Sequence, residues 1–442
     1  MHHHDSALSR LVRSRGTVFD LFSGRNNSLG LLRLLLASAV VVSHARILGF
    51  GDREFGYAFS SGQIDLGSLA VFGFFVLSGL LITRSGNRLP VGRFLWHRAL
   101  RLLPGLWVCL TATALVVAPL LYWRQHGSTA GYWQHPQGPL AYLRANWAIG
   151  ISQWGISGVM ETAHAQGLAF NNAFDGALWS LKYEVLCYLG VALLALTGSL
   201  TRARRAVLAV TVLLGWLVLS DAIGNRYMSG ALAAKHGGPF DVPLMGALDV
   251  DWVVYLGFAF ALGSLIELYK ERVPISDPLA ALAAATLLIT LSYGYFFAIG
   301  VPAYAYLLLW LAIRLPRPLQ KVGRTHDYSY GIYIYGFVVE QALATLGGAR
   351  WGFGAYLGLA LGGTLIVAML SWHLVERPAM RLKDRGRFHS VVRADTAPQP
   401  VRQRPRRTGS EAPAEFRCRS RPLHDGRIDA TGSSTRPYAP HG

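Results

Sequence analysis

The sequence is poor in charged residues, and this scarcity excludes an ordinary soluble domain. Asp, Glu, Lys and Arg make up 15% of its 442 residues, whereas soluble domains carry roughly a quarter. No removable leader is expected, because no apolar stretch near the start precedes a small-residue cleavage site. Cysteine is scarce too: Cys109, Cys187 and Cys418 lie far apart, which favours neither a disulfide framework nor a metal site.

Long apolar runs are what the sequence has in abundance. Hydrophobic residues account for 52% of the chain, and the mean hydropathy is +0.32. Runs of about 20 residues recur between Leu29 and Val375, long enough to cross a hydrocarbon core of about 30 Å. We therefore expect an all-α, polytopic membrane bundle of ten helices, the first of which acts as the insertion signal. The predicted ranges are 29–49, 65–84, 100–122, 177–199, 205–221, 248–269, 277–291, 295–313, 328–346 and 353–375.

The net charge of +18 follows the pattern of membrane topology. With both termini in the cytoplasm, 33 Lys and Arg residues fall on the cytoplasmic side and 7 on the outer side. Such an asymmetry is the positive-inside rule. Anionic lipid accounts for these basic connections better than nucleic acid does. We expect a multi-pass protein of the cell (inner or plasma) membrane, in contact with the lipid bilayer and with no nucleic-acid partner.

Three segments follow from these patterns. Residues 1–28 form a basic cytoplasmic segment, 29–378 the ten-helix membrane domain, and 379–442 an Arg- and Pro-rich cytoplasmic tail. The tail has too few aliphatic residues to fold, so disorder is expected. A long outer loop, 123–176, carries three tryptophans among amide side chains, namely Trp133, Trp147 and Trp154. Such a loop suits sugar recognition, and it equally suits an interfacial aromatic belt.

Two ionisable residues stand out in the first apolar run. Arg33 and His44 are eleven residues apart, which places both side chains on one stripe of a helix, about 16 Å apart along the axis. Ionisable groups within a membrane usually face a cavity or a partner. A histidine in such a place often serves helix packing, but its phase with Arg33 favours a functional role. We expect both side chains to line one shared, water-reachable chamber that opens to both membrane faces.

A carboxylate is expected at the depth of His44. Glu184 lies about 10 Å inside the outer end of the fourth run. There it is placed to orient and polarise the His44 imidazole, which would then act as a general base. The alternative is a structural ion pair with Lys182, formed through neighbouring helices.

Two arginines mark the cytoplasmic mouth of the third run. Arg98 and Arg101 are three residues apart and share one helix face. Two guanidinium groups at an apolar entrance suit a phosphate-bearing ligand, although flanking arginines are also a common topology signal. In the second run, Gly73, Ser78 and Gly79 are expected to allow close helix packing.

Six short motifs occur in order along residues 25–380. They are Arg33 and His44 in the first helix, FFVLSG at 74–79, Arg98 and Arg101, WSLKYE at 179–184, SYGIYIYGF at 329–337 and SWHLVERP at 371–378. In this order and with ten apolar runs, the chain resembles the acyltransferase 3 family of membrane proteins. Many relatives have His where this chain has Gly336, so no chemistry is assigned to the ninth helix.

The resemblance implies an O-acyltransferase with no bound cofactor. Its donor would be cytoplasmic acyl-CoA, commonly acetyl-CoA, and its acceptor a hydroxyl of an envelope polysaccharide, lipopolysaccharide or glycolipid. His44 would be the catalytic residue, Arg33, Arg98 and Arg101 its essential partners at the CoA moiety, and Glu184 the acid of the fourth-helix motif. His44 would act either as a general base or as a transient acyl carrier.

Two other classes of function remain open from the sequence. Intramembrane Arg, His and Glu residues also suit a transporter or flippase of a glycan or lipid intermediate. A flippase would have no need of a thioester. A scaffold role would leave His44 and Glu184 replaceable.

Overall fold

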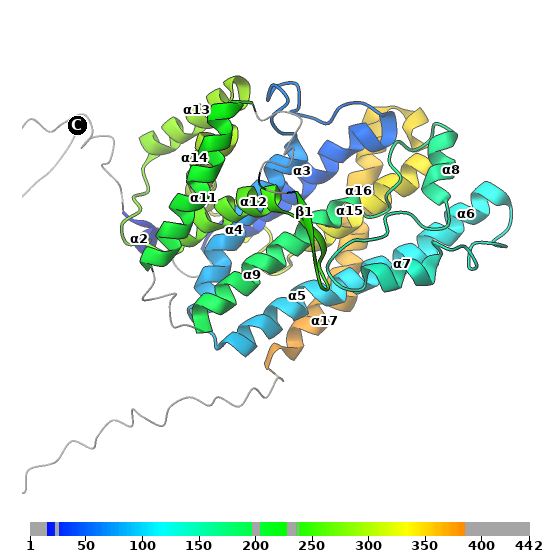
Figure 1. The fold of residues 1–442 in the computed structure, drawn as a ribbon, viewed down its shortest axis with the longest axis horizontal. Helices are drawn as coiled ribbons and strands as arrows, with labels where there is room; N and C mark the ends of the chain where they lie inside the picture. The colour runs from blue at the N-terminus through cyan, green and yellow to red at the C-terminus, as the bar shows by residue number, and fades with distance from the viewer. Residues whose placement is uncertain (1–15, 23–25, 197–203, 228–235, 237, 385–442) are drawn as a thin grey trace, which may run out of the picture. The chain divides into compact units, whose positions relative to one another are not determined.

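The computed structural model describes residues 16–22, 26–196, 204–227, 236 and 238–384 (Figure 1). The tail from residue 385 onward and the first fifteen residues lie outside the described part, so the expected disorder of the tail stays a prediction. The described part is a bundle of helices with one small hairpin.

A helix occupies each of the ten expected ranges. In order these are α3 (Leu29–Phe50), α4 (Leu66–Gly86), α5 (Val91–Ala112) continuing into α6 (Ala118–His126), η2 (Gly176–Ser180) with α9 (Leu181–Leu196), α11 (Arg204–Gly224), α12 (Val250–Leu268), α13 (Asp277–Tyr293), η3 (Phe296–Gly300) with α14 (Val301–Arg314), α15 (Ser329–Thr345) and α16 (Phe353–Ser371), which continues through η6 (Trp372–Glu376) into α17 (Arg377–Met380) and η7 (Arg381–Asp384). The predicted all-α polytopic fold is confirmed.

Eight of these helices in the described residues are long and apolar enough to cross a membrane. The two others, α13 and α15, have 17 residues each. Almost every residue of α15 is buried within the protein, including Tyr333, Phe337 and Glu340. Because protein rather than lipid surrounds α15, it does not need the full length of a lipid-facing span.

Three details differ from the expected layout. The third helix begins at Val91, nine residues earlier than predicted, and runs to His126 through the π-helical turn η1 (Thr113–Val117). The long outer loop contains two further helices, α7 (Pro139–Asn146) and α8 (Val159–Ala165). Ahead of α12, an antiparallel hairpin joins β1 (Pro239–Val242) to β2 (Gly246–Asp249). The residues of these two strands carry no alternating apolar pattern strong enough to predict strands from sequence.

Glycines set the closest helix contact. Phe260 of α12 has its carbonyl oxygen only 2.0 Å from the position that a Cβ at Gly79 of α4 would occupy. The reverse contact is equally close, with the Val76 carbonyl 2.0 Å from a Cβ at Gly263. The packing role expected for Gly79 is confirmed, because any side chain there would separate α4 from α12.

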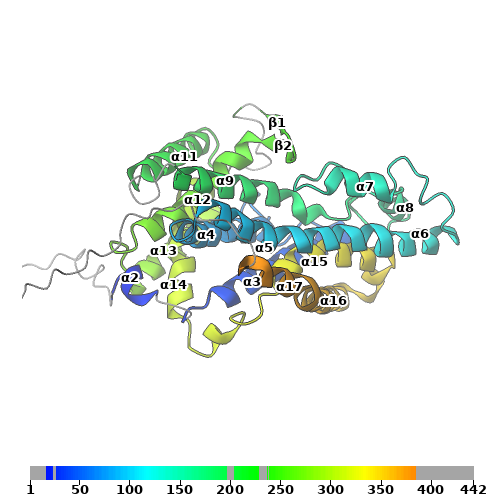
Figure 2. The same ribbon diagram turned by 90° about the horizontal axis from the view of Figure 1, so that it is seen from below.

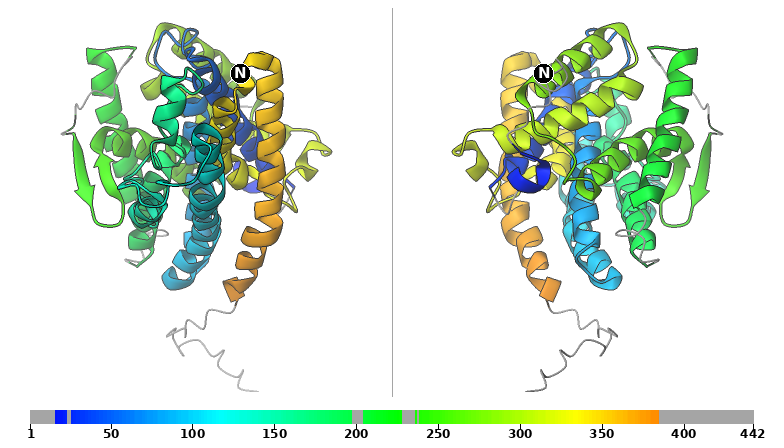
Figure 3. Two further views of the ribbon diagram at one scale, coloured as in Figure 1. Left: turned by 90° about the vertical axis from the view of Figure 1, so that its right-hand side faces the viewer. Right: turned by 90° about the vertical axis from the view of Figure 1, so that its left-hand side faces the viewer.

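Helices α3 and α15 run in the same direction, side by side, at the centre of the bundle. Asp327, just before α15, contacts Arg33 near the start of α3, and Phe337 contacts His44 near its end. Figure 2 shows α9, α11 and the hairpin on one side of the bundle and α16 and α17 on the other. Figure 3 shows α5 and α17 reaching the same end. We call this the arginine end, because Arg33, Arg98 and Arg101 lie there.

The outer helices expose large apolar side chains. Leu213 and Trp216 of α11 and Ile366 of α16 are 58%, 62% and 61% exposed. Such surfaces are unfavourable in water and suit lipid contact. The chain is a multi-pass membrane protein.

Candidate active site

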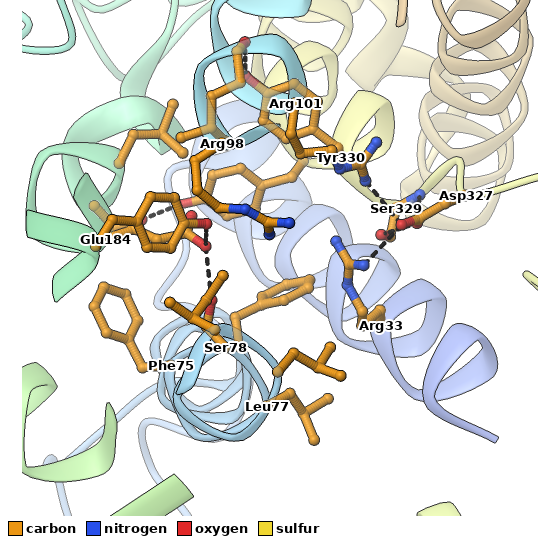
Figure 4. A pocket seen from close by; sticks show the side chains of 18 of the residues that line it. Arg33, Phe75, Leu77, Ser78, Arg98, Arg101, Glu184, Asp327, Ser329 and Tyr330 are labelled. Carbon is orange, nitrogen blue, oxygen red and sulfur yellow. Dashed lines mark hydrogen bonds and ion pairs between the residues drawn. The ribbon is translucent and has the colours of Figure 1, made fainter. Parts of the chain in front are cut away.

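A cavity of about 280 Å³ opens among the helices at the arginine end (Figure 4). All six sequence motifs contribute to its wall. The contributing residues are Arg33, Phe74, Ser78, Arg98, Arg101, Ser180, Glu184, Ser329, Tyr330, Tyr333 and Trp372. We call this cavity the arginine pocket. Segments that lie hundreds of residues apart in sequence therefore converge on one site.

Asp327 joins two of the arginines. Its Oδ2 atom lies 2.7 Å from Nη1 of Arg33 and 2.8 Å from Nη2 of Arg101. Arg101 also donates to Glu376 across 3.2 Å, and the two side chains are 11% and 2% exposed. Two carboxylates thus compensate Arg33 and Arg101, which are held at fixed positions in the wall.

The charge of Asp327 is secure over the whole physiological pH range. Burial alone would raise the pKa of its carboxyl, but the Arg33 and Arg101 guanidiniums and hydrogen bonds from Ser329 outweigh burial and lower the pKa to about 2. A depressed pKa means that the carboxylate stabilises the fold above its unfolded pKa, and that this stabilisation fades only as the pH falls from about 4 toward 2.

Arg98 differs from its two neighbours. No carboxylate lies within ion-pair distance of it among the described residues, and its buried Nε has no hydrogen-bond partner there. Figure 4 shows its guanidinium reaching into the cavity between Glu184 and Arg33. A guanidinium in a cavity with no direct ion-pair partner is prepared to bind an anion.

The wall as a whole is positively charged. Four basic side chains line the pocket, against two carboxylates. The basic ones are Arg33, Arg98, Arg101 and Lys383, and the carboxylates are Glu184 and Asp327. Because apolar helices surround these charges, their field is only weakly screened, which favours a negatively charged ligand.

Glu184 belongs to this pocket. It accepts hydrogen bonds from Ser78, at 2.8 Å, and from Tyr188. Lys182 donates instead to the backbone carbonyl of Ala247. Neither expected partner of Glu184 is therefore present: the pairing with His44 is wrong, and so is the ion pair with Lys182. The depth expected for Glu184 was wrong: Gly176, eight residues earlier, packs on the Phe337 ring that contacts His44, so Glu184 lies about 12 Å further into the bundle.

His44 lies in a second cavity, of about 500 Å³, at the opposite end of α3. Its Nδ1 atom is 3.5 Å from a carboxylate oxygen of Glu54, and the two side chains are 19% and 25% exposed. Trp154, Asn171 and Asn172 also line this space, which we call the His44 cavity. A carboxylate at Nδ1 favours the tautomer with its proton there, which leaves Nε2 able to accept one.

Hydrogen bonds hold the loop 123–176 over the His44 cavity. Gln341 of α15 donates to the carbonyls of Asn171 and Ala173, at 2.8 and 2.7 Å. Asp175, 1% exposed, accepts a hydrogen bond from Tyr142 of α7. Trp154 is fixed through its carbonyl, which accepts from the amide of Phe174 at 3.0 Å. The loop therefore presents its side chains to the cavity in a rigid frame.

The structure confirms one geometric expectation and corrects another. Arg33 and His44 share a stripe of α3, since each contacts the segment that begins at Asp327 and continues through α15. They do not share a chamber, because among the described residues none lines both cavities. Aromatic side chains of α15 stand between the two spaces.

Sequence reasoning missed three acidic residues of the site. Glu376 lies within the quoted SWHLVERP motif, and Asp327 lies two residues before the start of SYGIYIYGF at Ser329, so each was an acid in or near a recognised motif. Their partners lie 275 and 294 positions away, which no pattern in one sequence connects. Glu54 follows the first helix in a loop, where helical periodicity gives no direction.

Comparison with known proteins places the chain in a family. A family model described as an acyltransferase domain matches residues 26–373. The chain belongs to the acyltransferase 3 family. This membrane acyltransferase is 30% identical to nodulation protein 10 of Rhizobium leguminosarum bv. viciae, over 82% of this chain and 95% of that protein.

Two further relatives are enzymes by name. An O-acetyl transferase of Shigella phage Sf6 is 27% identical, over 80% of this chain and 96% of its own length. A putative membrane-bound transacylase, BcsY of Komagataeibacter xylinus, is 28% identical over 74% of this chain and 80% of its own. No solved structure matches the acyltransferase.

Proposed function

We propose that this acyltransferase moves an acyl group, acetyl in particular, from cytoplasmic acyl-CoA to a hydroxyl of an envelope or exported glycan or glycolipid. The observation that carries the proposal is Arg98, which has no direct ion pair, in a pocket with more basic than acidic side chains, at the end of α3 opposite the His44–Glu54 pair. One cavity suits a phosphorylated donor, and the other suits a polar acceptor beside a general base.

The donor side is assigned by charge. The positive-inside count supports a cytoplasmic location for the arginine end, where acyl-CoA is available. Arg98 would bind the CoA phosphates, while Arg33 and Arg101 are held by Asp327 and would position the donor from the wall. The apolar stretch of the pocket beyond them, with Phe74 and Leu77, suits the pantetheine arm.

The acceptor side is assigned by the residues around His44. His44 Nε2 would take the proton of the acceptor hydroxyl while its oxygen attacks the thioester carbonyl. The carbon–sulfur bond breaks, the acyl ester forms, and the proton passes from the imidazolium to the thiolate, which yields CoA as the thiol. Glu54 stabilises the imidazolium in this step.

A second route has the same balance of atoms. His44 first attacks the thioester and carries the acyl group as an acyl-imidazole, and the acceptor hydroxyl then displaces the imidazole. The two routes differ in whether an acylated enzyme accumulates when acceptor is withheld.

Radiolabelled acetyl-CoA tests the proposed function. The purified protein in proteoliposomes is supplied with the envelope glycan fraction of cells that lack it, and label in the glycan is measured together with the acetyl mass by mass spectrometry. We expect label in ester linkage. If the protein neither binds acetyl-CoA nor transfers its label, acetyl-CoA is not the donor. This is the result expected of a flippase.

Replacing Arg98 separates donor binding from the remaining steps. Arg98→Gln should weaken acetyl-CoA binding about ten- to a hundredfold, since it removes charge-assisted hydrogen bonds to phosphate. Arg88→Gln is the matched control, because Arg88 is exposed and outside the pocket. Equal affinities of the two variants, measured by calorimetry, would refute the docking role.

Trp154 is expected to contact the acceptor. It lines the His44 cavity, whereas Trp147 in the same loop does not. Trp154→Ala should lower the ratio of glycan acetylation to acetyl-CoA binding about two- to tenfold, the range for loss of one aromatic contact. Trp147→Ala should leave that ratio unchanged. If both variants behave alike, the loop serves only as an interfacial belt.

A further inference from the structure

Tyr333 closes the arginine pocket at the end that faces the His44 cavity. Its hydroxyl donates to the Ala177 carbonyl at 2.6 Å and therefore accepts from Ser180 Oγ at 2.7 Å, since a phenol has a single proton to donate. Tyr333 is 7% exposed and Ser180 5%. Both partners belong to η2, so two hydrogen bonds tie α15 to the start of the fourth helix.

Phe337 closes the His44 cavity from the other side. It lies four residues after Tyr333, on the same face of α15 and about 6 Å further along the axis. Its ring meets His44 edge-on, with 5.2 Å between ring centroids. A Cβ at Gly176 would lie 2.4 Å from Phe337 Cζ, so the ring covers that glycine directly.

These contacts form one thin partition. Tyr333 faces the arginine pocket and Phe337 the His44 cavity, with η2 completing the partition opposite them. Phe74 of α4 packs on Tyr333, with 5.9 Å between ring centroids. We call Tyr333, Phe337, Gly176 and Ser180 the septum.

We propose that the septum is a gate, latched by the hydrogen bonds of Tyr333, which must open for the acyl group to reach His44. The inference rests on the proposed function, because a donor bound at Arg98 and a base at His44 lie on opposite sides of it. A closed septum keeps the thioester from the water of the His44 cavity until donor and acceptor are both bound.

Without the hydrogen bonds of Tyr333, acetyl-CoA should be hydrolysed without transfer of its acetyl group to an acceptor. In Tyr333→Phe both hydrogen bonds of the hydroxyl are lost, and in Ser180→Ala one is lost. We expect hydrolysis of radiolabelled acetyl-CoA without acceptor to rise about two- to tenfold, the effect of one or two hydrogen bonds. Tyr335→Phe is the matched control, since Tyr335 is 5% exposed on the same helix and lines neither cavity.

The outcomes separate the gate from the proposed function. Wild-type protein that neither binds nor cleaves acetyl-CoA would reject the function itself. If the wild-type protein is active and Tyr333→Phe, Ser180→Ala and Tyr335→Phe all hydrolyse acetyl-CoA at its rate, the gate is rejected and the proposed function stands. A loss of both hydrolysis and transfer in Tyr333→Phe, at unchanged acetyl-CoA affinity, would also reject it, since Tyr333 would then take part in the chemistry.

Sided labelling tests the septum without catalysis. His44→Cys is made in a background with Cys109, Cys187 and Cys418 changed to Ala, and a membrane-impermeant maleimide is added to inverted vesicles. We expect no labelling with Tyr333 present and labelling after Tyr333→Ala. Right-side-out vesicles should be labelled in both cases. Equal labelling of inverted vesicles with and without Tyr333 would overturn the proposal.

Discussion

Asp327→Asn should destabilise the acyltransferase by about 1–3 kcal/mol, because it leaves two partly buried arginines without a shared charged partner. Asn keeps the size of the side chain but removes the charge that Arg33 and Arg101 share. Arg101 retains Glu376, so Arg33 loses the most. Because the arginines also shape the donor site, acetyl-CoA affinity should fall in the same variant. Thermal unfolding in detergent and calorimetry measure the two effects.

An exposed ion pair supplies the control for Asp327. Asp277 pairs with Arg314 at 2.5 Å, but its side chain is 52% exposed. Asp277→Asn should cost less than about 1 kcal/mol, as exposed pairs do, and leave donor affinity unchanged. Asp327→Glu should restore part of both properties. Equal effects of Asp327→Asn and Asp277→Asn on stability and donor affinity would show that Asp327 does not hold the arginines of the donor site.

His44→Ala should have a large effect on the rate of acetyl transfer. Loss of a general base typically lowers the rate about 10²- to 10⁴-fold, and loss of an acyl carrier would be at least as severe. Glu54→Gln should lower the rate only about fivefold, because the pair is partly exposed and its interaction is screened. Neither change should alter acetyl-CoA affinity, since His44 and Glu54 line the other cavity.

The helices were predictable because each rests on a local property of the chain. Apolar runs of about 20 residues located all ten, and the 3.6-residue period placed Arg33 and His44 on one stripe. Where helix ends depend on tertiary packing, as at Val91, the prediction missed by several residues. The hairpin before α12 was missed for the same reason.

The partners of the site residues were not predictable, because they depend on which helix faces which. Residue counts along each helix put Glu184 at the depth of His44, but packing places Gly176, eight residues before Glu184, against the Phe337 ring that contacts His44. Asp327 reaches Arg33 across 294 positions of sequence. The division into two cavities depends on Tyr333 and Phe337, whose motif SYGIYIYGF gave no sign of which side chains meet η2.

Acetyl transfer by His44→Ala membranes distinguishes a catalytic His44 from a structural one. Radiolabelled acetyl-CoA and the envelope glycan fraction are given to membranes that contain wild-type protein or the variant at matched abundance, and acetyl-CoA affinity is measured on the same preparations. We expect transfer to be lost while donor binding stays at the wild-type level. Transfer at the wild-type rate in the variant would show that His44 has no catalytic role.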